Sequence, residues 1–181
     1  MPRYTKIIAS VIAASISLCF STTLKMIRTD GLGGKGQTIM PSDGYTSVLF
    51  WFHGLGDTCD GWASQMRQFN LDKTKIILPT ARNRPISING GGEMPGWSDI
   101  HGLGEDDVED RIGFEESRER IQQLYNQEIE KGIPSSKICI AGFSQGGALA
   151  LHFALRNPQP LSCVVALSTW LPLRDEYVYN S

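Results

Sequence analysis

Residues that bind metals or nucleic acids are scarce in this chain. Its 181 residues include three histidines and four cysteines, and the cysteines lack the spacing of a zinc or iron–sulfur site. A net charge of −2 gives no electrostatic basis for binding nucleic acid. The sequence therefore predicts neither a metal site nor a nucleic-acid partner, and its length suits a single folded domain.

Cysteine is also too sparse for a disulfide-rich scaffold. Cys139 and Cys163 lie in apolar, strand-like runs, where a buried free thiol is the usual state. Cys19 falls within the N-terminal segment, so Cys59 is the cysteine expected at the surface. Free thiols are predicted, without a disulfide framework.

Long apolar runs are absent except near the N-terminus. Two basic residues precede the apolar run Ile7–Phe20, which is short for a membrane span and ends among small residues. This pattern resembles a secretory signal, while the basic, hydroxylated stretch at 21–28 also fits an organelle transit peptide. A signal anchor, or a start at Met26 that removes the leader, stays open. We expect a targeting segment over residues 1–30.

A flexible connection is expected to follow this segment. Residues 31–36 spell Gly-x-Gly-x-x-Gly, but no strand precedes them and no helix follows, so the context of a dinucleotide site is missing. We predict a linker over residues 31–44 and a folded domain over residues 45–181.

The most informative stretch joins a short apolar run to a helix through Gly-x-Ser-x-Gly. Residues Ile138–Ala141 favour a strand, residues Ala148–Arg156 favour a helix, and Ser144 lies in the turn between them. This order is that of a nucleophile elbow, where glycines let strand and helix pass closely and a strained turn presents the serine. We expect Ser144 to be a nucleophile and the backbone N–H of Gln145 to face an oxyanion.

A second loop suits the other half of an oxyanion hole. The unbroken apolar run Ser47–Phe52 predicts a buried strand, and His53-Gly54-Leu55-Gly56 follows it directly. Hydrolases with a nucleophile elbow place a backbone donor in such a loop. We expect Leu55 to supply that N–H, and His53 to be a hydrogen-bonding scaffold rather than a base.

The remaining elements alternate between strand and helix. Strands are predicted over Lys75–Pro79 and Leu161–Leu167, and helices from a cap at Thr58 or Asp60 to about Phe69 and over Phe114–Lys131. This alternation predicts an α/β fold with a doubly wound, mainly parallel sheet and a crevice at the carboxyl ends of its strands.

The segment from residue 80 to residue 100 shows no clear secondary-structure pattern. Loops of this length are usually functional or disordered. Met94 and Trp97 lie beside glycines here and could form a hydrophobic lip for an acyl chain, although plain packing of loop residues is equally open.

Five segments, residues 52–62, 94–100, 132–135, 142–149 and 167–173, together resemble the acyl-protein thioesterase and lysophospholipase family of α/β hydrolases. The resemblance implies Ser144 as nucleophile, Leu55 and Gln145 as oxyanion-hole donors, and a substrate contact at Trp170. It also implies that no metal or organic cofactor is needed. The implied substrates are S-acylated proteins or single-chain lipids and other acyl esters, met in the cytoplasm with transient contact to membrane surfaces.

The resemblance stops before the rest of the catalytic triad. In α/β hydrolases an acid and then a histidine follow the serine, whereas here Asp175 and Glu176 are followed by no histidine. His152 lies eight positions beyond Ser144, about 12 Å along a helix, and His101 has no evident acid partner. We expect a C-terminally truncated hydrolase with little activity and an apolar, open sheet edge. The alternative is a non-catalytic scaffold that binds acyl chains or a partner protein.

Overall fold

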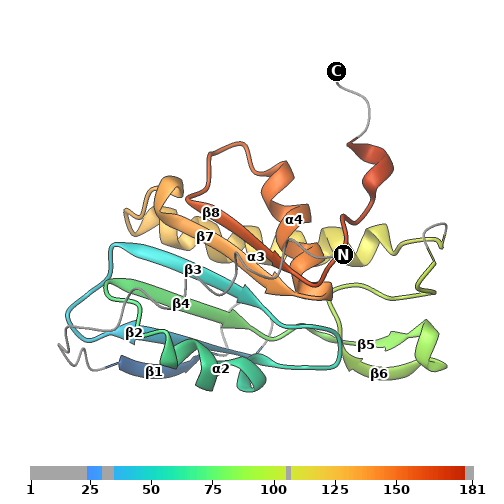
Figure 1. The fold of residues 1–181 in the computed structure, drawn as a ribbon, viewed down its shortest axis with the longest axis horizontal. Helices are drawn as coiled ribbons and strands as arrows, with labels where there is room; N and C mark the ends of the chain where they lie inside the picture. The colour runs from blue at the N-terminus through green and yellow to red at the C-terminus, as the bar shows by residue number, and fades with distance from the viewer. Residues whose placement is uncertain (1–23, 30–34, 105–106, 178–181) are drawn as a thin grey trace, which may run out of the picture.

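A six-stranded sheet with helices on both faces forms the body of the protein. The computed structural model describes residues 24–29, 35–104 and 107–177 (Figure 1). The sheet strands are β1 (Leu24–Thr29), β2 (Gly36–Pro41), β3 (Ser47–Phe52), β4 (Thr74–Pro79), β7 (Ile138–Phe143) and β8 (Cys163–Leu167). The other elements are α2 (Cys59–Gln68), β5 (Asn83–Ile86), η1 (Ser87–Asn89), β6 (Gly92–Pro95), α3 (Arg111–Glu130), η2 (Ser135–Lys137), α4 (Gln145–Arg156) and η3 (Arg174–Glu176).

The strand order is β1-β2-β4-β3-β7-β8, and the last four strands in this order are parallel to one another. Strands β1 and β2 pair antiparallel on the other side of β4. The predicted α/β fold with a mainly parallel sheet is therefore confirmed. The carboxyl ends of the parallel strands meet at one edge, where the small β5–β6 hairpin also lies (Figure 1).

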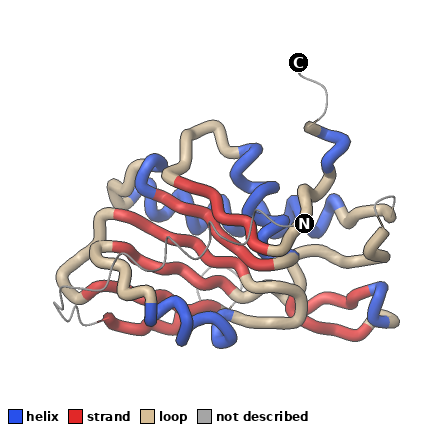
Figure 2. Tube along the Cα trace, viewed as in Figure 1, coloured by secondary structure: helices blue, strands red, loops and turns tan. Residues whose placement is uncertain are grey.

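Helices α3 and α4 cover one face of the sheet, and α2 covers the other (Figure 2). Alternate side chains of β3 enter different cores: Phe50 and Phe52 pack under α3 and α4, whereas Trp51 packs under α2. A strand covered on both faces needs apolar residues at every position, which explains the unbroken run over 47–52. The hydroxyl of Thr58 accepts a hydrogen bond from the N–H of Asp60 at 3.2 Å, so the predicted cap of α2 is confirmed.

The sheet begins earlier in the chain than predicted. β2 lies inside the expected linker 31–44, and the side chains of Gln37, Thr38 and Ile39 are buried. β1 lies inside the expected targeting segment 1–30 and pairs with β2 from Leu24 to Thr29. The linker prediction is therefore wrong for residues 36–41. Residues 1–23 lie outside the described residues, and the targeting segment stays a prediction.

The segment from residue 80 to residue 100 is more ordered than predicted. Its middle folds into the antiparallel β5–β6 hairpin, closed by η1 and by Gly90 and Gly91, which have φ of 65° and 82°. Positive φ values suit glycine, so the Gly-rich run serves as the turn. The backbone N–H of Gly56 donates to the carbonyl of Pro95 at 2.8 Å, tying the hairpin to the loop after β3.

Two cysteine predictions are wrong. Cys139 and Cys163 face each other in the register of β7 and β8 and form a disulfide, with Cα atoms 4.7 Å apart. Cys59, expected at the surface, is buried between α2 and the sheet. Two apolar runs that look independent in the sequence become neighbouring strands, and this pairing could not be read from either run alone.

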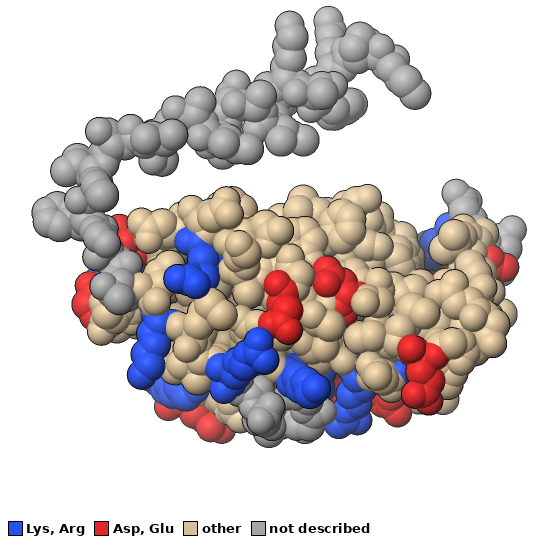
Figure 3. Space-filling model, turned by 90° about the horizontal axis from the view of Figure 1, so that it is seen from below, with Lys and Arg blue, Asp and Glu red and all other residues tan. Residues whose placement is uncertain are grey.

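β8 is the edge strand among the described residues, and its side chains are poorly covered. Val164, Val165 and Leu167 are 40%, 39% and 43% exposed. This agrees with the predicted open, apolar sheet edge. Figure 3 shows the molecule from below the view of Figure 1, where lysine, arginine, aspartate and glutamate side chains lie at the surface.

Candidate active site

Ser144 lies at the tight turn between β7 and α4. Its φ of 53° and ψ of −124° are rare for a residue with a side chain, and such strain concentrates at functional sites. Its N–H donates to the carbonyl of Leu167 at 2.9 Å, and its carbonyl accepts from the N–H of Ala148 at 3.1 Å and the hydroxyl of Thr169 at 2.7 Å. The turn therefore has the geometry predicted for a nucleophile elbow.

Both glycines of the motif are required by close backbone packing. A Cβ atom on Gly142 would lie 2.3 Å from the carbonyl oxygen of Gly146. A Cβ atom on Gly146 would lie 2.2 Å from the carbonyl oxygen of Phe52. The elbow is thus pressed against the end of β3, and no side chain fits between them.

The loop after β3 passes directly beside the nucleophile. A Cβ atom on Gly54, the residue before Leu55, would be 3.4 Å from the Cβ of Ser144. A turn from the Gly54 carbonyl to the N–H of Asp57, at 3.2 Å, fixes the loop. In the described part of the chain, the N–H of Leu55 has no hydrogen-bond acceptor. α4 begins at Gln145, and the first N–H groups of a helix lack partners within it.

None of the three histidines forms a hydrogen bond to the Ser144 hydroxyl within the described residues. His53 is buried; its Nε2 accepts from the N–H of Ala81 at 2.9 Å, so its Nδ1 carries the proton and donates to the carbonyl of Gly54 at 2.7 Å. Burial lowers the pKa of His53 and keeps the ring neutral. The scaffold role predicted for His53 agrees with this geometry.

His152 is also fully engaged. Its Nδ1 accepts from Arg156 at 3.0 Å, which leaves Nε2 to donate to Glu115 at 3.0 Å. Burial, and then the nearby Arg156, lower the pKa of His152. This histidine joins α3 to α4 and is not available as a base.

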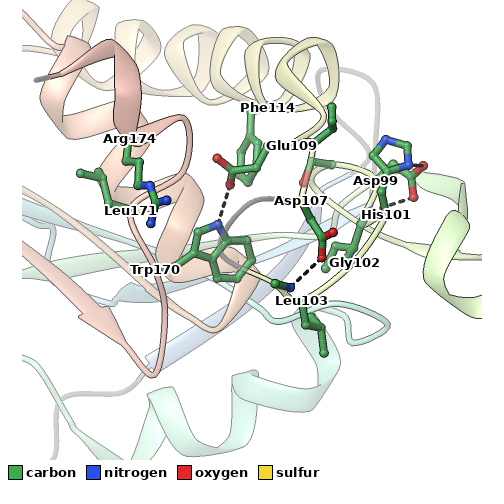
Figure 4. A pocket seen from close by; sticks show the side chains of 14 residues that line it. Asp99, His101, Gly102, Leu103, Asp107, Glu109, Phe114, Trp170, Leu171 and Arg174 are labelled. Atoms are coloured by element: carbon green, nitrogen blue, oxygen red, sulfur yellow. Dashed lines mark hydrogen bonds and ion pairs between the residues drawn. The ribbon is translucent and has the colours of Figure 1, made fainter.

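His101 is half-exposed and, contrary to expectation, has an acid partner. Its Nδ1 lies 3.5 Å from Oδ2 of Asp99. The same carboxylate accepts from the N–H and hydroxyl of Ser87 at 2.7 and 2.5 Å. Burial would raise the pKa of Asp99, but these hydrogen bonds outweigh it and lower the pKa. The pair lies away from Trp170 in the close view of the pocket (Figure 4).

A pocket of about 380 Å³ lies between the segment that starts at Ser98 and the segment after β8 that contains Trp170. Figure 4 shows Phe114, Trp170 and Leu171 on one side and the loop through Leu103 on the other. Trp170 Nε1 donates to Glu109 at 2.7 Å, which fixes the indole in the wall. Ser144 does not line this pocket, but Ser98 lines it and is bonded to the side chain of Gln145.

The three predicted substrate-contact residues have different positions. Trp170 lines the pocket. Trp97 is only 1% exposed, packs against Phe52 and donates its Nε1 proton to the carbonyl of His53 at 2.8 Å, so its assignment to a hydrophobic lip is wrong. Met94 is half-buried, with its sulfur against Gly56 of the Leu55 loop. No local pattern singled out Glu109, whose carboxylate also accepts from the N–H of Leu173 at 2.6 Å.

The described residues contain no group of three or more histidine, cysteine or carboxylate side chains that could hold a metal ion. In the same residues, none of the helices is long and apolar enough to cross a membrane.

Residues 34–180 match the Phospholipase/Carboxylesterase family. The chain belongs to this family. This family member is 38% identical over 149 residues to the acyl-protein thioesterase 1 of Cryptococcus neoformans var. neoformans serotype D, which covers 80% of the chain and 63% of the relative. It is 40% identical over 157 residues to acyl-protein thioesterase 1 of Mycosarcoma maydis, covering 77% and 65%.

Solved structures agree with the family assignment. The crystal structure of Zea mays acyl-protein thioesterase 2 superposes with a TM-score of 0.67 at 31% identity, over 78% of this chain and 64% of that one. Arabidopsis thaliana SOBER1 gives 0.66 at 29% identity, over 70% and 62%. This member of the family therefore spans less than two thirds of the length of each of these four relatives.

Proposed function

We propose that this chain carries the nucleophile and oxyanion hole of a serine hydrolase that cleaves acyl thioesters or esters. The observation that carries the proposal is Ser144, held at a positive φ beside the loop of Gly54 and Leu55. The relatives named acyl-protein thioesterase support S-acylated proteins as the substrate class. Single-chain lipid esters share the acyl group and are the second substrate class.

The reaction begins with attack of the Ser144 hydroxyl oxygen on the acyl carbonyl carbon. The N–H groups of Leu55 and Gln145 stabilise the oxyanion, and departure of the thiol or alcohol leaves an acyl-enzyme that water hydrolyses. The apolar side chains of the pocket, Phe114, Leu171 and Trp170 among them, would hold the acyl chain. Polar groups at the rim, such as Asp107, would stay in water.

The proposed reaction also needs a general base that takes the proton of the Ser144 hydroxyl. His53 and His152 use both ring nitrogens in structural hydrogen bonds, so the base is either His101 or a histidine outside these 181 residues. We favour the second, because His101 is paired with Asp99 and forms no hydrogen bond to the Ser144 hydroxyl within the described residues. Without its histidine, a serine hydrolase of this type loses about 10⁶ in turnover.

The test is labelling by a fluorophosphonate, compared among the wild-type chain, Ser144→Ala and His101→Ala. Slow labelling that disappears in Ser144→Ala and persists in His101→Ala is expected. Labelling that survives Ser144→Ala would contradict the nucleophile assignment, and loss of labelling in His101→Ala would make His101 the base.

A second function is a non-catalytic scaffold that binds acyl chains or a partner protein. The absence of a histidine hydrogen-bonded to the Ser144 hydroxyl, among the residues described, favours it. Turnover of p-nitrophenyl acetate that Ser144→Ala abolishes would exclude this alternative.

A further inference from the structure

The side chain of Gln145 has a role separate from that of its backbone N–H. It is 0% exposed at the first position of α4, directly after Ser144. Its Oε1 accepts from the N–H of Trp97 at 2.9 Å, and its Nε2 donates to the carbonyl and the hydroxyl of Ser98 at 2.8 and 3.0 Å. The oxygen and the nitrogen of the Gln145 side-chain amide are thus both hydrogen-bonded to Trp97 and Ser98, which are distant from Gln145 in the sequence.

That segment leads into a wall of the pocket. Ser98 and the residues through Gly104 line the pocket on one side. The segment has other supports, since the Trp97 ring donates to the carbonyl of His53 and the Trp97 carbonyl accepts from the hydroxyl of Ser117. Gln145 is the support that comes from the nucleophile's own helix. The Gln145 side chain therefore links the first turn of the nucleophile's helix directly to the start of this wall.

We propose that the Gln145 side chain is a positioning residue that holds the pocket wall relative to Ser144 and so determines which acyl chains place their carbonyl at the nucleophile. This inference rests on the proposed function, because it concerns the same serine and pocket. A misplacement of about 1 Å can reduce the rate about a hundredfold. A long acyl chain touches the wall and depends on its position, whereas a two-carbon group does not reach it.

Two substitutions separate the side chain from the backbone donor. Gln145→Met keeps the length and removes all three hydrogen bonds, whereas Gln145→Glu keeps an acceptor for Trp97 and loses the donor to Ser98. Both keep the N–H of residue 145. The matched control is Gln122→Met on α3, since Gln122 is partly buried and its side chain donates to Asn126 at 2.9 Å in a hydrogen bond at the surface.

The measurement is the rate of Ser144 labelling by two fluorophosphonates, one with an ethyl chain and one with a dodecyl chain. We expect the dodecyl-to-ethyl ratio to fall about tenfold in Gln145→Met, less in Gln145→Glu, and to stay unchanged in Gln122→Met. A purely structural defect would lower both rates together. An unchanged ratio in Gln145→Met would overturn the proposal.

Hydrogen exchange of residues 97–104 gives a readout that does not need catalysis. Exchange should accelerate there in Gln145→Met while the middle of α3 stays protected. If neither reagent labels the wild-type chain, the proposed function fails and exchange alone decides: faster exchange supports the positioning role of Gln145, and unchanged exchange refutes it.

Discussion

Strands β3 and β8 are equally apolar in sequence but have opposite environments. Phe50 and Phe52 of β3 are fully buried, whereas Val164, Val165 and Leu167 of β8 are exposed. β3 has a strand on each side and a core on each face, while β8 pairs, among the residues described, with β7 alone. Burial of a strand is therefore decided by its neighbours, and its own residues give only the capacity for it.

β8 is held in place by strand pairing, a disulfide and a backbone hydrogen bond rather than by burial of its side chains. It pairs with β7 from Cys163 to Leu167, and the disulfide joins the two strands at the first of these pairs. At the other end the carbonyl of Leu167 accepts from the N–H of Ser144. We therefore expect the regions around β3 and β8 to respond differently to mutation, to reduction of the disulfide and to pH.

The largest expected difference comes from truncating one side chain on each strand. Phe50→Ala removes a ring from the centre of the larger core and should destabilise the fold by about 4 kcal/mol. Val165→Ala removes a partly exposed side chain and should cost less than about 1 kcal/mol. Urea unfolding of both variants measures this, and equal losses would contradict the contrast between the strands.

Reduction of the disulfide should have the next largest effect. Cross-linking residues 24 positions apart stabilises a fold by about 3 kcal/mol. A reducing agent should therefore lower the melting temperature of the wild-type chain to that of Cys163→Ser. The variant itself should not respond to the reductant. A wild-type chain that also shows no response would mean that the disulfide does not support β8.

The smallest expected effect concerns the hydroxyl of Tyr45, whose side chain packs against the core under α3 and α4. Tyr45 donates to Glu128 at 2.9 Å, and burial together with this bond raises the pKa of Tyr45 to about 12. Because the folded-state pKa is raised, the stabilisation is complete below about pH 10 and is lost as the pH rises through 12.

A spectrophotometric titration of tyrosinate in the folded chain tests this value. We expect a late step near pH 12 that Tyr45→Phe removes. A titration in which Tyr45→Phe removes no step near pH 12 would contradict this value.

The elements with strong local patterns were predictable from the sequence. β3 has the predicted bounds 47–52, and β4 and β7 differ from the prediction by one or two residues. α4 begins at Gln145 rather than Ala148, because the glycines before Ala148 are helical despite their low propensity. Ser144 was predictable because the Gly-x-Ser-x-Gly motif lies between a predicted strand and a predicted helix, and all three patterns indicate a turn at this serine.

The elements that depend on pairing were not predictable in the same way. β2 has polar residues at Gln37 and Thr38, and its place in the sheet comes from pairing with β1 and β4. Trp97 looked like a loop aromatic because nothing local shows that it packs on Phe52. The side-chain role of Gln145 depends on residues nearly fifty positions away, and such a contact leaves no periodic trace.

The peptide of Ser144 is tied at both ends to β8 and the loop that follows it. Its N–H donates to Leu167, and its carbonyl accepts from the hydroxyl of Thr169. A displacement of the edge strand is therefore transmitted directly to the backbone torsions of the nucleophile. The position of the serine hydroxyl thus depends on how firmly the disulfide and the β7 pairing hold β8.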